Sequence, residues 1–222
     1  VSQSYPTNSP ISARPDWRPA QGKPGSSLAD MQKQALDPFR VSYGICNPLY
    51  GVQMVFSEDM QDAFCRALND WLGREWLDKD DRLRGSIVIP TQSVEKCVAE
   101  IERCAAEKRF VQVLMLVMGD MPLGKRAYWP IYAAAERLGL AIGIHAGSAY
   151  HNPPTAGGWG SYHIEDYVAQ ATAFQTQLTR LIVEGVFARH PNLKMVMLES
   201  GFTWLPAYLW RLHKFWRGIR ME

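Results

Sequence analysis

The sequence predicts an α/β fold, a (β/α)8 TIM barrel of which about five β/α units are visible. Strand-like runs alternate with amphipathic helical segments five times, and these runs are apolar almost throughout, which indicates parallel strands covered by helices. An open doubly wound sheet would share these features. No strand-to-helix junction, however, carries a glycine-rich phosphate-binding motif. Polar residues instead follow each strand-like run, and a barrel gathers such positions at one mouth. These are Cys46-Asn47, Thr91-Gln92, Gly119-Asp120, His145 and Glu199-Ser200.

Each element has its own local signal. The strands are expected at residues 41–46, 84–89, 110–117, 141–145 and 193–198. Ser57 and Ser93 each precede an amphipathic segment and are typical N-caps, while Gly139 is a typical helix end. The helices are expected after Ser57, after Ser93, over 127–138, over 165–189 and from about Trp204 onward.

Composition excludes several classes of protein. The 222 residues are 47% hydrophobic and 21% charged, which is sufficient for a sizeable core and excludes a disordered chain. The apolar run Val111–Met118 is much shorter than a membrane span. A net charge of +2 gives no electrostatic reason to expect a nucleic-acid partner. Four cysteines without a C-x-x-C pair are typical of buried thiols, and no signal-peptide pattern opens the chain, so a cytoplasmic protein is expected.

The chain divides at about residue 40. Residues 1–39 contain regularly interspersed prolines without helical or strand periodicity and are expected to form an extended arm or loop. Tyr5 and Trp17 are expected to pack this arm against another surface. Residues 40–222 are expected to form the barrel domain. That domain is expected to be incomplete at both ends, because eight units normally occupy about 250 residues.

Two polar residues at predicted strand ends are the strongest candidates for chemistry. His145 ends a buried strand among small residues, where a neutral imidazole is suited to binding a divalent metal or to acid–base catalysis. Glu199 ends the next strand, so a barrel would place both residues at the same height on neighbouring strands. A carboxylate in such a mouth is suited to act as a general base.

A long loop between these strands supplies further candidates. Residues 147–165 contain aromatic and histidine side chains, and long loops in compact domains are often substrate walls. The candidate substrate-binding residues are Trp159, Tyr162, His151 and His163.

Three phrases together resemble the amidohydrolase-related family (amidohydrolase 2) that includes aminocarboxymuconate semialdehyde decarboxylase and dihydroxybenzoate decarboxylases. They are Tyr128–Leu140, Ile144–Gly147, and Arg189–Lys194 with Leu198–Gly201. The resemblance covers about residues 40–217. It implies a metal-dependent-hydrolase barrel that holds a divalent metal, often zinc, with His145 as a ligand, and it implies a homodimer. No H-x-H motif occurs in the chain, so the other metal ligands would have to come from outside it.

The resemblance implies an enzyme acting on a small carboxylated or cyclic substrate, by hydrolysis of a C–N or C–O bond or by non-oxidative decarboxylation. Many relatives have His-Gly-Gly where this chain has Glu199-Ser-Gly. Glu199 could replace that histidine as the base. A catalytically inactive, barrel-derived binding or scaffold subunit is the alternative that this departure leaves open.

Overall fold

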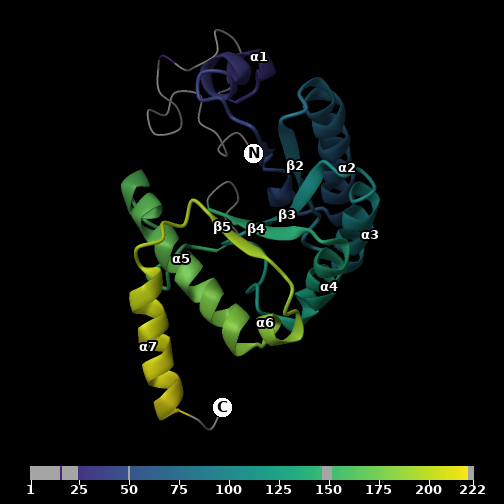
Figure 1. Ribbon diagram of the computed structural model, residues 1–222. Helices are drawn as coiled ribbons and strands as arrows, with labels where there is room; N and C mark the ends of the chain where they lie inside the picture. Colours follow the sequence, from purple (N-terminus) through teal and green to yellow (C-terminus); the bar gives the residue numbers. More distant parts are fainter. Residues whose placement is uncertain (1–15, 17–24, 50, 147–151, 220–222) are drawn as a thin grey trace.

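The computed structural model describes residue 16 and residues 25–49, 51–146 and 152–219, with the side chain of residue 163 left out. Within these residues, five strands form one sheet in the order β1-β2-β3-β4-β5, and each neighbouring pair is parallel. The sheet curls as half of a barrel (Figure 1). An in-order parallel sheet confirms the barrel prediction, because a doubly wound sheet reverses its strand order. The strands are β1 (Gly44–Cys46), β2 (Leu83–Val88), β3 (Phe110–Leu116), β4 (Ala141–His145) and β5 (Met195–Leu198).

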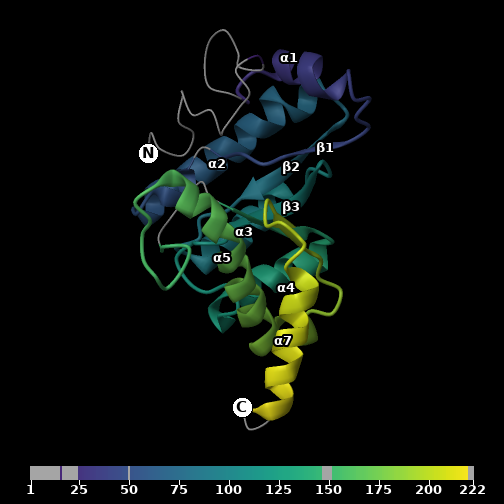
Figure 2. The ribbon, with the colours of Figure 1, turned by 90° about the vertical axis from the view of Figure 1, so that its left-hand side faces the viewer.

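The helices are α1 (Leu28–Met31), α2 (Glu58–Glu75), α3 (Val94–Cys104), α4 (Trp129–Leu138), α5 (His163–Val183), α6 (Val186–Arg189) and α7 (Leu205–Gly218). Helices α2, α3 and α4 cover the convex side of the sheet, and α7 packs against α5 (Figures 1 and 2). Shorter turns are η2 (Gln32–Leu36), η3 (Val52–Met54), η4 (Leu77–Lys79) and η5 (Arg126–Tyr128). Ser57 and Ser93 cap α2 and α3, and Gly139 ends α4 with a φ of +71°. These caps confirm the local signals.

The helix predicted over 165–189 is in fact two helices. Gly185 takes a left-handed φ of +75° and separates α5 from α6. Glycine adopts this conformation without the steric penalty of a Cβ atom, so the chain can turn there before it enters β5.

The end of the predicted arm is helical. Residues 28–36 form α1 and η2, and Leu36 is buried in the core. Gln32 donates a 2.8 Å hydrogen bond to Asp80, and Asp37 forms a 2.8 Å ion pair with Arg82. Tyr5 and Trp17 lie outside the described residues.

The sheet separates two layers of side chains. Alternate residues of the central strands pack with α3 and α4 in one large apolar core, which includes Ile87, Val113, Met115, Ile142, Ile144, Ile101 and Ile131. Intervening residues face the concave side, where Ser86, Gln112, Gly143 and His145 lie. Three of the four cysteines are buried, as expected. Among the described residues, no helix combines the length and apolar character that a bilayer span would require.

Asn69 of α2 completes the hydrogen bonding of β2. The pairing of β1 with β2 ends at Cys46, opposite Gly85, so the following part of this β2 edge has no strand beside it. The Asn69 side chain accepts from the Val88 N–H and donates to the Val88 carbonyl, both at 2.9 Å. Buried backbone groups without a partner are destabilising, and the amide removes that penalty here.

The same amide also stabilises a buried carboxylate. Asn69 donates a 2.7 Å hydrogen bond to Glu100 on α3, and Arg103 donates two more at 2.7 Å. Burial disfavours the charged form of Glu100, yet these hydrogen bonds outweigh burial and hold its pKa below the ordinary value. One side chain therefore joins β2, α2 and α3.

We expect Asn69→Ala to lower the free energy of unfolding by about 3 kcal/mol, because it leaves two backbone groups and part of a carboxylate unpaired. Chemical denaturation measures this. Asn152→Ala is the matched control, since Asn152 makes a 2.8 Å bond to the Gly119 carbonyl at the surface. The control should change stability by less than about 0.5 kcal/mol. Equal effects of the two substitutions would contradict the account of Asn69.

Candidate functional site

The register between β4 and β5 brings the two main candidates together. His145 is the last residue of β4 and pairs with Leu198, so Glu199 follows immediately at the same edge of the sheet. Nε2 of His145 lies 3.5 Å from Oε1 of Glu199. The two predicted residues therefore form one pair at the carboxyl ends of neighbouring strands.

His145 is oriented by its own backbone neighbour. The ring is buried, with 4% of the residue exposed, and its Nδ1 contacts the Ala146 carbonyl. A carbonyl only accepts hydrogen bonds, so Nδ1 carries a proton and Nε2 faces Glu199. In the neutral ring Nε2 offers a lone pair toward a carboxylate. A cation, either a proton or a metal ion, is needed between two such acceptors.

The backbone conformation of Glu199 determines where its side chain lies. Its φ is +62°, in the left-handed region that non-glycine residues seldom adopt, and 68% of its side chain is exposed. The contact with His145, which donates to the carboxylate when Nε2 also carries a proton, is the main cause that lowers the pKa of Glu199 below its ordinary value. The contact therefore favours the charged form of this side chain.

A buried polar layer lies on the concave face of β2 and β3. Gln112 donates from Nε2 to Ser86 Oγ at 2.7 Å and to Asn47 Oδ1 at 3.0 Å, and Ser86 donates to the same Asn47 oxygen at 2.7 Å. The Gln112 amide covers Gly143, where a Cβ atom would lie 2.4 Å from the Gln112 Cδ. Gly143 precedes His145 by two residues on the same face, so this layer packs beside the candidate site.

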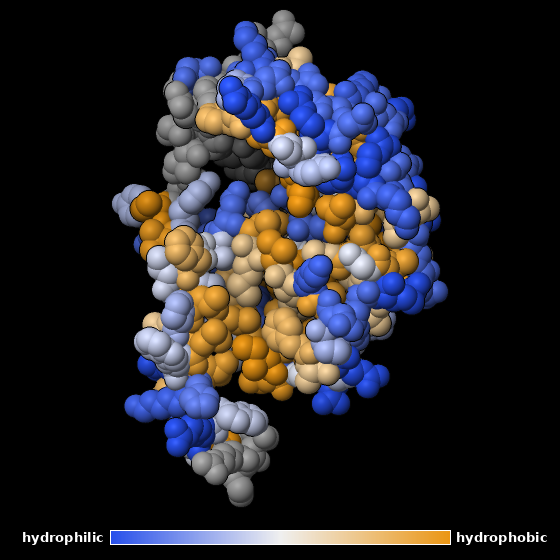
Figure 3. Space-filling model, viewed as in Figure 1, coloured by the Kyte–Doolittle hydropathy of each residue, from blue (hydrophilic) through white to orange (hydrophobic). Residues whose placement is uncertain are grey.

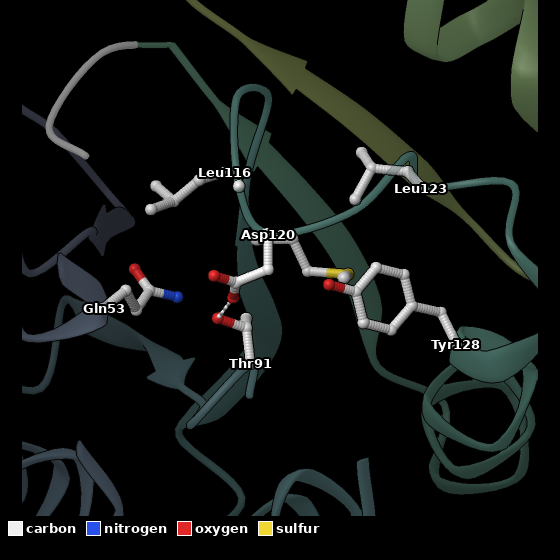
Figure 4. A pocket seen from close by; sticks show the side chains of 8 residues that line it. Gln53, Thr91, Leu116, Asp120, Leu123 and Tyr128 are labelled. Carbon is white, nitrogen blue, oxygen red and sulfur yellow. Dashed lines mark hydrogen bonds between the residues drawn. The ribbon is translucent and has the colours of Figure 1, made fainter. Parts of the chain in front are cut away.

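A second polar group surrounds a cavity of about 10 Å³ at the ends of β2 and β3, enough for one water molecule (Figure 4). Thr91 donates a 2.7 Å hydrogen bond to Asp120, and Gln53 and Tyr128 approach from η3 and η5. Leu116, which pairs with His145, also lines it. The sequence marked Thr91 and Asp120 only as polar strand ends and Tyr128 only as part of a segment that resembles the family, and it gave no signal for Gln53.

The structure describes two of the four predicted loop residues in full. Trp159 and Tyr162 are largely exposed before α5, which begins at His163. Glu165 accepts hydrogen bonds from the Ser161 and Tyr162 N–H groups and so holds this entry to the helix. His151 and the side chain of His163 lie outside the described residues. Substrate contacts by these four residues remain a prediction.

The described residues contain no group of three or more His, Cys, Asp or Glu side chains arranged to hold a metal ion. A catalytic metal normally has three protein ligands. His145 has the donor chemistry for one of them, and Glu199 faces the same space.

Comparison with known proteins identifies the chain's relatives. The family model described as amidohydrolase matches residues 5–218. The chain is 27% identical over 171 residues to gamma-resorcylate decarboxylase of Rhodococcus jostii, covering 72% of this chain and 52% of that protein. It is 28% identical over 145 residues to 2-amino-3-carboxymuconate-6-semialdehyde decarboxylase of Dictyostelium discoideum, covering 64% and 39%. The chain thus spans about half the length of the curated relatives it matches.

A crystal structure of dihydroxybenzoic acid decarboxylase from Polaromonas sp. JS666, with bound manganese and the inhibitor 2-nitroresorcinol, has a similar fold. The TM-score is 0.66 at 23% identity, and the match covers 83% of this chain and 58% of that one.

We expect Gly143→Ala to destabilise the protein by about 1–3 kcal/mol, because the new methyl group would collide with Gln112. Thermal or chemical unfolding measures this. Gly73→Ala is the control, since no atom lies within 4 Å of a Cβ built there, and alanine favours the helix. Adding Gln112→Ala to Gly143→Ala should recover part of the loss. A Gly143→Ala protein as stable as the Gly73→Ala protein would contradict the packing described.

Proposed function

The chain belongs to the amidohydrolase family, as the resemblance predicts, and from this we propose that its protein is a metal-dependent enzyme that decarboxylates a small carboxylated substrate without oxidation. The observation that carries the proposal is the pairing of His145 with Glu199 at 3.5 Å across β4 and β5. Two matched relatives named as decarboxylases support the choice of reaction.

Glu199 is the proposed proton carrier. A carboxylate has the chemistry of a general base, and the exposure of Glu199 leaves it accessible to a substrate. In the proposed reaction the C–C bond to the carboxylate breaks, carbon dioxide leaves, and a proton replaces it on carbon. Glu199 takes that proton from an acidic group of the substrate and returns it to the carbon.

His145 is the proposed metal ligand in this chain, through Nε2. The buried ring and the Nδ1 contact with the Ala146 carbonyl fix the direction of that nitrogen. A divalent ion held there, together with ligands from outside the described residues, would orient the substrate carboxylate and stabilise negative charge. Zinc follows from the family resemblance, while the Polaromonas structure carries manganese. The activity test below therefore uses zinc and manganese.

Hydrolysis is the second proposed reaction, because an ionised Glu199 is also suited to activate water. Trp159, Tyr162, His151 and His163 remain the proposed substrate contacts. A homodimer and a cytoplasmic location also remain predictions.

We expect the purified protein, supplied with zinc or manganese, to release carbon dioxide from gamma-resorcylate or a related hydroxybenzoate. Glu199→Gln keeps the shape of the side chain but removes its ionisable group, so turnover should fall about 100-fold or more. Carbon dioxide release and loss of substrate absorbance are the measurements. Glu102→Gln is the control, since Glu102 is a surface residue of α3 paired with Arg137.

Full activity of the Glu199→Gln protein would remove Glu199 from the mechanism. Release of an acid from an ester, amide or lactone panel, without carbon dioxide, would favour the hydrolase. Binding of these compounds without turnover would favour the inactive binding subunit.

We also expect one divalent ion per molecule of the whole protein after dialysis, and its loss in His145→Ala. Elemental analysis measures the bound metal. His213→Ala is the matched control, because His213 lies on α7 and lines a surface hollow formed by residues of that helix, and it should keep the ion. Equal metal contents of the two variants would refute the role of His145 as a ligand.

A further inference from the structure

The turn after β5 contains two left-handed residues. Glu199 has a φ of +62° and Gly201 a φ of +64°, with Ser200 between them. Glycine adopts this conformation freely, whereas a glutamate there is strained. A strained residue persists only where surrounding contacts hold it, so the contacts of this turn determine where the Glu199 carboxylate lies.

Ser200 is where the turn is held. The residue is 8% exposed, and its hydroxyl donates a 2.6 Å hydrogen bond to the Gly201 carbonyl. Its own carbonyl accepts a 2.9 Å hydrogen bond from the indole N–H of Trp204. The indole bond comes from outside the turn and therefore ties it to the beginning of α7.

Trp204 is connected to a second helix, α5, through Tyr208 of α7. Its indole packs edge-on against Tyr208, with ring centroids 6.0 Å apart and an interplanar angle of 84°. The Tyr208 hydroxyl forms a 2.7 Å hydrogen bond with Thr179 Oγ1 of α5. Trp204 also packs against the large apolar core. The indole N–H is therefore presented from a fixed ring.

We propose that Trp204 is a positioning residue for Glu199: its indole N–H, bonded to the Ser200 carbonyl, holds the left-handed turn that keeps the Glu199 carboxylate beside His145. The exposed carboxylate has no buried pocket to fix it, so its backbone must do so. This inference rests on the proposed function of Glu199. It adds a residue that touches neither substrate nor metal.

The test replaces Trp204 with phenylalanine, which keeps an aromatic ring but removes the N–H donor. We expect kcat to fall about tenfold, the size of one hydrogen bond, while KM changes less than twofold. Trp210→Phe is the matched control, because Trp210 lies on the same helix and is 75% exposed. Its kcat should stay within twofold of the unchanged protein.

A double-substitution cycle separates positioning from general damage. If Trp204 acts through Glu199, Trp204→Phe should lower kcat less than twofold when Glu199→Gln is already present. A full tenfold loss in that background would overturn the proposal, as would an unchanged kcat in the single variant.

A crystal structure of the Trp204→Phe protein gives a readout that needs no activity. We expect residue 199 to leave the left-handed region and its carboxylate to move out of reach of His145. An unchanged turn would overturn the proposal. If the unchanged protein shows neither decarboxylase nor hydrolase activity, the proposed function fails. The crystal structure of the variant then decides by itself whether Trp204 holds the turn.

Discussion

The parallel pairing of β4 with β5 is the constraint on which the candidate site depends. His145 lies opposite Leu198, and the next residue of β5 is Glu199. Successive side chains of a strand point to opposite faces, so a shift of one residue would turn the His145 ring toward the helices. The apolar residues Ile142 and Ile144, which alternate with Gly143 and His145, prevent such a shift because they belong to the core under α3 and α4.

The concave face of β2 and β3 carries polar side chains that bond to one another. Gln112 bonds to Ser86 and Asn47, and its amide occupies the space that a side chain at Gly143 would fill. This layer fixes the spacing of β2, β3 and β4 beside His145 without bulky apolar groups. On α2, the Asn69 side chain pairs with the Val88 backbone of β2. The curved sheet thus depends on a few amide side chains as well as on its apolar core.

The surface shows where the half-barrel ends. Apolar side chains are exposed across the middle of the face in Figure 3, around the edge strand β5. Val196 on β5 and Ile45 on β1 are exposed apolar residues of the two edge strands. Unpaired strand edges readily pair with further strands. An eight-stranded barrel has three strand positions beyond these five, between β5 and β1.

Local signals in the sequence predicted the elements well, since apolar runs and caps such as Ser57 and Gly139 act within a few residues. They also predicted that His145 and Glu199 would be neighbours, because strand ends converge in a parallel sheet. The break at Gly185 was missed, because a glycine inside a helical pattern is compatible with continuation or with a turn. The contacts of Gln53, Asn69 and Gln112 could not be predicted, since their partners lie 19 to 65 residues away in the chain.

The electrostatics of the pair favour a bound cation. Nδ1 of His145 contacts the Ala146 carbonyl, so Nε2 is the nitrogen that faces Glu199 and is available to a cation. The nearby carboxylate would stabilise a cation bound at that nitrogen. The same contact lowers the pKa of Glu199, and the exposure of its carboxylate leaves it accessible to a substrate. In the proposed function the buried ring, with its fixed nitrogen, would bind the cation, and the exposed carboxylate on the strained turn would move the proton.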